Sequence, residues 1–205
     1  MSKTNEERLN DLFARLDSLS YIKPDSIPDI PLYMDQVTTF MDEHLGQTKR
    51  YPEDKVLTKT MINNYAKNNL LPPPIKKKYS KEHMLMLIFI YYFKNLLSFH
   101  DIEELFRPIL GKHFSKESGL SLERIYNEVF SLEDGQLKNL KADVAEKFLQ
   151  ANQTFSDAPD TDREYLQLFS FICELSFDVY LKNQMIERLI DGLRDGQETG
   201  TKKKR

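Results

Sequence analysis

One unbroken apolar run constrains the fold of this chain more than any other feature of the sequence. The ten residues from Met84 to Phe93 are all apolar or aromatic, and Ser80 before them can cap a helix. A helix that is apolar nearly all round must be covered by other elements. A membrane span requires about 20 such residues, so this run is too short to be one. It predicts the buried central helix of a small helical domain.

The rest of the chain also favours helices. Only 7 of the 205 residues are Gly, while Leu, Lys, Glu, Phe and Tyr are frequent. Residues 5–20, 32–45 and 162–193 carry apolar side chains at helical spacing. The N-terminal MSKTNEERLNDLF lacks the apolar core of a signal peptide. We therefore predict an all-α, cytoplasmic protein that does not enter a membrane.

Residue types that carry chemistry are scattered along the sequence. His100 and Glu104 share a helical spacing, but two ligands do not make a zinc or iron site. Cys173 lies among Phe169, Phe171 and other apolar residues, as a small buried side chain would. The sequence has no Gly-rich phosphate loop. We expect no enzymatic activity, no cofactor and no metal.

Positive charge is concentrated in one segment. Residues 49–82 hold nine Lys or Arg against three Asp or Glu, a net charge of +6, which leaves −9 on the rest of a chain whose total is −3. Such a localised field suits one docking face for a polyanion. A solvated basic face without a partner is the alternative that charge alone leaves open.

A polar helix is expected over residues 58–69, with Thr58 as its N-cap. Met61, Ile62 and Tyr65 fall on one side of this helix. Asn can bind the edge of adenine with two hydrogen bonds in the major groove, so the opposite side is a candidate reading face, although an ordinary surface face has the same pattern. That side holds Thr60, Asn63, Asn64 and Lys67.

Three prolines and three lysines follow this helix. Pro72 excludes the α conformation for the residue before it, and Asn69 is suited to the left-handed position that closes a helix. We expect the triple proline to form an extended strut that projects Lys76, Lys77 and Lys78 towards phosphates. A proline-rich ligand for a recognition domain is the rival interpretation.

The order of these blocks, including "LLPPP", a basic stretch and "SFHDI", resembles the winged helix-turn-helix of the mercury-resistance-regulator (MerR) family. The block "MINNYAKNNLLPPPIKKKYSKEHMLMLIFI" resembles more closely a bacterial family catalogued as domain of unknown function eighteen thirty-six, which has a similar head. The resemblance covers about residues 30–110. It implies a DNA-reading helix and a wing in which Lys77 and Tyr79 occupy the MerR family's Arg-x-Tyr positions. Asn63 departs from the Arg of the MerR recognition helix.

We divide the chain into four parts. They are an N-terminal amphipathic helix and linker (1–28), a MerR-like helix-turn-helix domain (29–114), a helical C-terminal region ending in a long helix (115–195) and a disordered basic tail (196–205).

The resulting hypothesis is a DNA-binding transcriptional regulator that reads duplex DNA with helix 58–69 and the adjacent basic wing. We expect a homodimer through the C-terminal helices. An alternative is a non-catalytic protein–protein adaptor built on the same head, and a further possibility is a pocket for an apolar effector among the C-terminal helices. The candidate DNA-binding residues are Thr60, Asn63, Asn64, Lys67, Lys76, Lys77, Lys78 and Tyr79.

Overall fold

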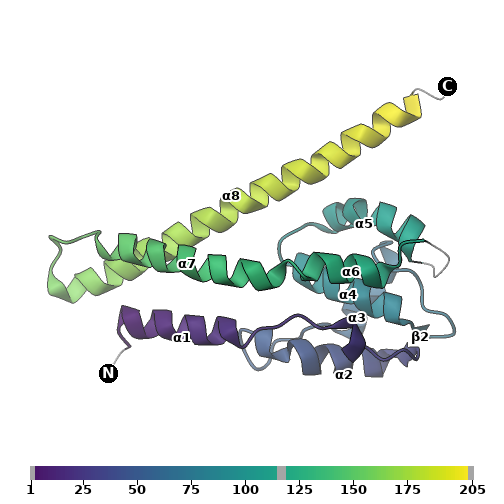
Figure 1. Cartoon of the computed structure of the whole chain (residues 1–205), viewed down its shortest axis with the longest axis horizontal. Coiled ribbons are helices and arrows are strands. Elements are labelled where there is room, and N and C mark those ends of the chain that lie inside the picture. Colours follow the sequence, from purple (N-terminus) through teal and green to yellow (C-terminus); the bar gives the residue numbers. More distant parts are fainter. Residues whose placement is uncertain (1–2, 115–118, 203–205) are drawn as a thin grey trace. The chain divides into compact units, whose positions relative to one another are not determined.

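The computed structural model describes residues 3–114 and 119–202, and nearly all regular structure in them is helical (Figure 1). The prediction of an all-α protein is confirmed. The chain divides into two compact units. We call residues 21–130 and 187–205 the head, and residues 1–20 and 131–186 the helical unit. Among the helices of the described residues, none combines the length and the apolarity that a membrane span requires.

Among its described residues up to Phe130, the head contains six helices or strands around a central helix, together with two short 3-10 turns; the last part of the C-terminal helix also belongs to it. The elements are η1 (Pro24–Ser26), β1 (Leu32–Tyr33), α2 (Met34–Leu45), η2 (Gly46–Thr48), α3 (Lys59–Lys67), β2 (Lys78–Tyr79), α4 (Lys81–Phe93), α5 (Phe99–His113) and α6 (Leu122–Phe130).

Helix α4 is the centre of the head, as its apolar sequence predicts. Residues 83–90 are all buried. The ring of Phe89 lies 5.4 Å from that of Tyr126 and 6.3 Å from that of Phe106, so α4 packs against α6 and α5. The hydroxyl of Tyr126 donates a hydrogen bond to the carbonyl of Ile22 at 2.6 Å. Because α6 belongs to this core, the compact head runs to Phe130, past the boundary expected at residue 114.

Helix α5 differs from its expected length. A proline ordinarily ends or kinks a helix, but α5 continues to His113 with Pro108 inside it. A proline inside a helix removes one hydrogen bond and costs about 3 kcal/mol. Ile109, Leu110 and Phe114 pack against the head core, and this burial stabilises the continuation.

The helical unit consists of α1 (Asn5–Asp17), α7 (Glu133–Asn152) and the first part of α8 (Asp160–Lys202). The backbone N–H of Asn5 donates to the carboxylate of Glu164 at 3.2 Å, which joins the starts of α1 and α8. Leu9, Phe13 and Leu175 pack around the small core of this unit. The buried core residues are Val144, Phe148, Ala151 and Phe171.

Helix α8 is longer at both ends than the expected 162–193. The carbonyl of Pro159 accepts hydrogen bonds from the amides of Asp162 and Arg163, both at 2.9 Å, so the helix starts at Asp160. It continues to Lys202, through part of the segment expected as a disordered tail, and residues 203–205 of that segment lie outside the described residues.

Candidate nucleic-acid interface

Helix α3 turns its polar face outwards. The hydroxyl of Thr58 accepts a hydrogen bond from the backbone N–H of Met61 at 3.2 Å and caps the helix start, as predicted. Ile62 and Tyr65 are buried in the head core. The side chains predicted for the opposite face are all exposed; they are Thr60, Asn63, Asn64 and Lys67.

Two features fix the orientation of this face. The ring of Tyr65 lies 5.8 Å from that of Phe99 on α5, and burial raises the pKa of the Tyr65 hydroxyl. At the helix end, Asn69 has φ 59°, the left-handed conformation that the sequence predicts. The amide of Leu70 then donates to the carbonyl of Tyr65 at 3.0 Å and closes the helix.

The lysines after the prolines lie on a tight turn rather than on an extended strut. The amide of Ile75 donates to the carbonyl of Lys78 at 3.1 Å, and the amide of Lys78 donates back at 3.0 Å. Lys76 and Lys77 between them have φ 51° and 62°. These values define a two-residue hairpin turn in which both central residues are left-handed, a position that favours Asn and Gly. We call residues 75–78 the lysine turn; Lys76 and Lys77 are exposed at its tip.

The strand after the turn separates Lys78 from Tyr79. In the antiparallel pair of β1 and β2, Tyr33 lies opposite Lys78 and Leu32 opposite Tyr79. The ammonium of Lys78 lies 4.9 Å from the centre of the exposed Tyr33 ring. Tyr79 is 3% exposed, because successive strand residues point to opposite sides. Tyr79 therefore belongs to the core and not to the surface on which the sequence placed it.

Three of the nine basic residues in segment 49–82 have acidic partners. Lys49 pairs with Asp42, Lys59 pairs with Asp35, and Lys81 lies 3.2 Å from Asp29 and 3.3 Å from Glu123. Within the described residues, the other six form no ion pair. These six are Arg50, Lys55, Lys67, Lys76, Lys77 and Lys78. Four of them belong to α3 or the lysine turn, so the unneutralised positive charge is concentrated beside the polar face of α3.

A small cavity of about 240 Å³ lies beside α3, and no sequence pattern indicates it. Asn64, Tyr65 and Phe99 are among its lining residues. Lys94 also lines it; its ammonium donates to the carbonyl of Val56 at 3.0 Å, and burial lowers its pKa. Helical periodicity cannot indicate this site, because it depends on contacts between residues about 30 positions apart.

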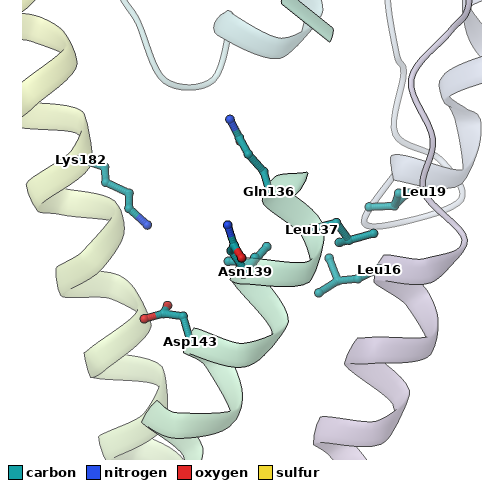
Figure 2. A pocket seen from close by; sticks show the side chains of 8 residues that line it. Leu16, Leu19, Gln136, Leu137, Asn139, Asp143 and Lys182 are labelled. Carbon is teal, nitrogen blue, oxygen red and sulfur yellow. The ribbon is translucent and has the colours of Figure 1, made fainter. Parts of the chain in front are cut away.

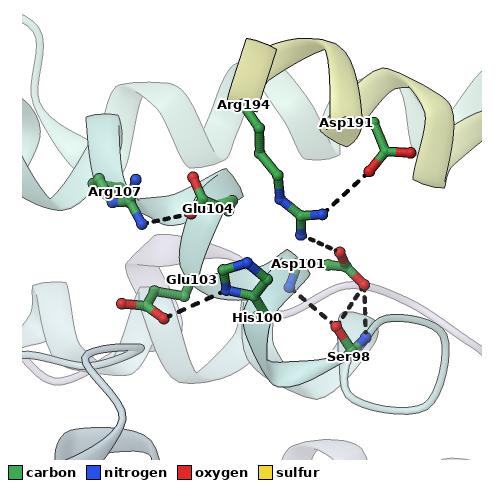
Figure 3. A network of polar contacts seen from close by, with 8 residues as sticks. All are labelled: Ser98, His100, Asp101, Glu103, Glu104, Arg107, Asp191 and Arg194. Atoms are coloured by element: carbon green, nitrogen blue, oxygen red, sulfur yellow. Dashed lines mark hydrogen bonds and ion pairs between the residues drawn. The ribbon is translucent and has the colours of Figure 1, made fainter. Parts of the chain in front are cut away.

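A polar network fixes the start of α5 (Figure 3). The hydroxyl of Ser98 donates to the carboxylate of Asp101 at 2.6 Å, and the guanidinium of Arg194 on α8 also donates to it at 2.6 Å. The Ser98 hydroxyl, with a further contribution from Arg194, holds the pKa of Asp101 below its usual value. Ile190 is buried in the same core. The last part of α8 is thereby attached to the helix that supports Tyr65.

The described residues contain no group of three or more His, Cys, Asp or Glu arranged to hold a metal. In Figure 3, His100 lies beside Glu103, at 4.0 Å, and the buried carboxylate of Glu104 accepts a hydrogen bond from Arg107 at 2.6 Å. His100 and Glu104 thus have different partners.

A family model matches residues 22–129, more than half of the chain, and its description is Domain of unknown function (DUF1836). The matched region includes α3, the lysine turn, all of α4 and α5, and α6 as far as Val129. No curated protein and no solved structure matches the chain. The chain belongs to the family Domain of unknown function (DUF1836).

Proposed function

We propose that the protein is a DNA-binding transcriptional regulator that reads duplex DNA with α3 and contacts its backbone with the lysine turn. The observation that carries this proposal is the exposed polar face of α3 beside lysines that have no acidic partner among the described residues. The order β1, α2, α3, lysine turn, β2 and α4 supports a winged helix-turn-helix like that of the MerR family.

Helix α3 has the size and chemistry for the major groove. Its nine residues span about 13.5 Å, comparable with a groove about 12 Å wide. Asn63 and Asn64 supply amides for base edges, while Thr60 and Lys67 suit phosphate contacts. Ile62 and Tyr65 anchor the helix from behind.

In this proposal the lysine turn supplies the electrostatic attraction to the DNA phosphates. Lys76 and Lys77 lie in a conformation that costs about 1–2 kcal/mol for each residue with a Cβ. Asn and Gly would reduce this cost, so a contact with phosphates explains two lysines at this tip better than stability does.

A salt titration of binding to a short DNA duplex tests the proposal. Five or six phosphate contacts predict that log K falls with a slope of about −5 per decade of salt. Replacing Lys76, Lys77 and Lys78 with Ala should reduce the magnitude of that slope by about 2.7 and weaken binding of all sequences alike.

The matched control is Lys23→Ala with Lys138→Ala, since both lysines are exposed and lie on other elements. A flat titration for the unaltered protein, or a slope that the triple variant leaves unchanged, would contradict DNA binding through this surface. Stoichiometric capture of one protein in place of DNA would favour the adaptor alternative.

Asn63→Ala with Asn64→Ala separates reading from attachment. This variant should lose preference between duplexes selected from a random pool, by about 1–3 kcal/mol for each lost bidentate contact, with the salt slope retained. Loss of the slope together with the preference would assign both asparagines to the backbone instead.

Self-association through α8 is part of the proposal. Tyr165, Ile172, Val179 and Ile186 are exposed and lie seven residues apart, the period of a two-stranded coiled coil. We expect Ile172→Asp with Val179→Asp to be monomeric in sedimentation equilibrium at concentrations where the unaltered chain is dimeric. If the unaltered chain stayed monomeric at every concentration tested, the proposed dimer would be wrong.

A further inference from the structure

A second cavity, of about 480 Å³, lies among the three helices of the helical unit. Its volume is within the range of small-molecule sites. Figure 2 shows Leu16 of α1 and Leu19, just after that helix, near Leu137 of α7, while Lys182 of α8 points towards α7. The lining residues are Leu16, Leu19, Gln136, Leu137, Asn139, Leu140, Asp143 and Lys182. We call this space the leucine cavity.

The leucine cavity lies where two of the three helices around the core remain apolar and the third becomes polar. On α7, Leu140 precedes the core residues Val144 and Phe148 by four and eight positions, so all three lie on one face. On α1, Leu16 follows Phe13, which packs against the core, by three positions. Both apolar faces therefore continue from the core into the cavity.

The third helix does not continue in the same way. On α8, Phe171 and Leu175 contribute to the core, but Asp178 and Lys182 follow at the same spacing, seven positions on. The leucines of α1 and α7 thus meet a polar wall in place of a third apolar one. An apolar molecule in this space would complete the core.

The polar wall is balanced in charge. The ammonium of Lys182 lies 2.7 Å from the carboxylate of Asp178, and Lys147 pairs with Asp143 and lies 3.5 Å from Asp178. A charged ligand group would have to compete with these pairs. The amides of Gln136 and Asn139, both exposed, offer hydrogen bonds to an uncharged group.

We propose that the leucine cavity binds a neutral amphipathic small molecule, with its apolar body against the leucines and one hydrogen-bonding head at Gln136 and Asn139. This binding does not require that the protein bind DNA. The site lies outside the matched family region, in the unit formed by residues 1–20 and 131–186.

Three probes that share an eight-carbon apolar chain and differ only in head group test the proposal: octan-1-ol, nonanoate and octylammonium. Isothermal titration calorimetry on the full chain should give octan-1-ol the lowest Kd, with both charged probes at least tenfold weaker. Equal affinities, or a preference for either charged probe, would overturn the assignment of a neutral ligand.

Leu140→Trp fills the cavity from a position that is already 38% exposed, so the fold should tolerate it. It should weaken octan-1-ol binding at least tenfold. Leu149→Trp is the control, because Leu149 is 62% exposed on the same helix and does not line the cavity. Unchanged binding in Leu140→Trp would show that the alcohol adheres to exposed apolar surface elsewhere and would overturn the site.

Discussion

The head and the helical unit are both built mainly from helices, yet they differ in how much apolar surface each one buries. The head gathers apolar side chains from all of its helices around α4 into one continuous core. Among the described residues of the helical unit, the buried apolar side chains are Val144, Phe148, Ala151 and Phe171, whereas side chains such as Tyr165 are 68% exposed. The head therefore has the core of an independently stable domain, whereas the helical unit has not covered its apolar surface.

This difference bears on the roles that we propose for the two units. A unit with a complete core can expose a polar, positively charged surface without loss of stability, and α3 with the lysine turn is such a surface. A unit with an incomplete core gains stability from whatever covers it, by about 25 cal/mol for each Å² of apolar surface removed from water. A second chain packed on the exposed apolar residues of α8, or a ligand in the leucine cavity, would stabilise the helical unit by covering apolar surface.

The largest expected effect compares a truncation in each core. Phe106 is 1% exposed and its ring lies near those of Phe89 and Phe93, so Phe106→Ala should destabilise the head by about 4 kcal/mol. Phe148 is 6% exposed, with Phe171 beside it, and Phe148→Ala should cost the helical unit about 3 kcal/mol or less, because the smaller core can relax.

Chemical denaturation followed by hydrogen exchange measures the two losses separately. Leu149→Ala on exposed surface is the control and should change stability by less than about 0.5 kcal/mol. A loss in Phe148→Ala as large as that in Phe106→Ala would remove the distinction between the two cores.

The next effect depends on pH and concerns only the head. Buried His83 lies between Tyr79 and Phe114, and burial lowers its pKa. The carbonyls of Pro73 and Pro72 favour the charged ring and so oppose this shift of the His83 pKa. Neither carbonyl makes a hydrogen bond of standard geometry to Nε2, which has no partner among the described residues. The effect of burial on the pKa is therefore larger than that of the carbonyls.

Because the folded head holds His83 neutral, the unfolded chain binds one proton more between the lowered pKa and the ordinary value of about 6.5. Stability is therefore complete above about pH 6.5 and is lost as the pH falls, by up to about 1.4 kcal/mol per pH unit. His83→Gln should flatten this dependence in urea unfolding between pH 7.5 and 5. Identical slopes for both proteins would mean that another group is responsible.

A smaller effect, of opposite sign, is expected at the lysine turn. Lys76→Asn with Lys77→Gly gives the residues preferred for this two-residue turn, and it should stabilise the head by about 1–2 kcal/mol. The same variant removes two charges, so the DNA salt slope should fall by about 1.8. A gain in stability with unchanged binding would make the turn a purely structural feature.

Much of the head could be predicted because its signals are local. The N-caps Thr58, Ser80 and Ser98 each lie directly before a helix, and Asn69 adopts its left-handed conformation as the sequence indicates. Each of these depends on hydrogen bonds within four residues. The exposed face of α3 follows from its period alone.

Other features depend on partners far along the chain and had no local signal. Tyr79 is buried because β2 pairs with β1, 46 residues earlier, and Pro108 lies inside α5 because its neighbours have a core to pack against. The leucine cavity arises where α8 becomes polar opposite α1 and α7. No property of Asp178 or Lys182 in the sequence indicates which helices they face.

The smallest effect compares the capping boxes of Thr4 and Ser98, which lie in different units. Ser98→Ala removes the hydroxyl that accepts from the amide of Asp101, and Thr4→Ala removes the one that accepts from the amide of Glu7, both at 3.2 Å. A lost cap costs about 1 kcal/mol. Asp101 also holds Arg194, so Ser98→Ala should loosen the end of α8 as well, whereas Thr4→Ala should affect α1 alone. Hydrogen exchange at the amide of Ile190 measures this difference. We expect faster exchange in Ser98→Ala than in Thr4→Ala. Equal rates would mean that the buried Ile190 side chain holds the end of α8 in place without help from the polar network.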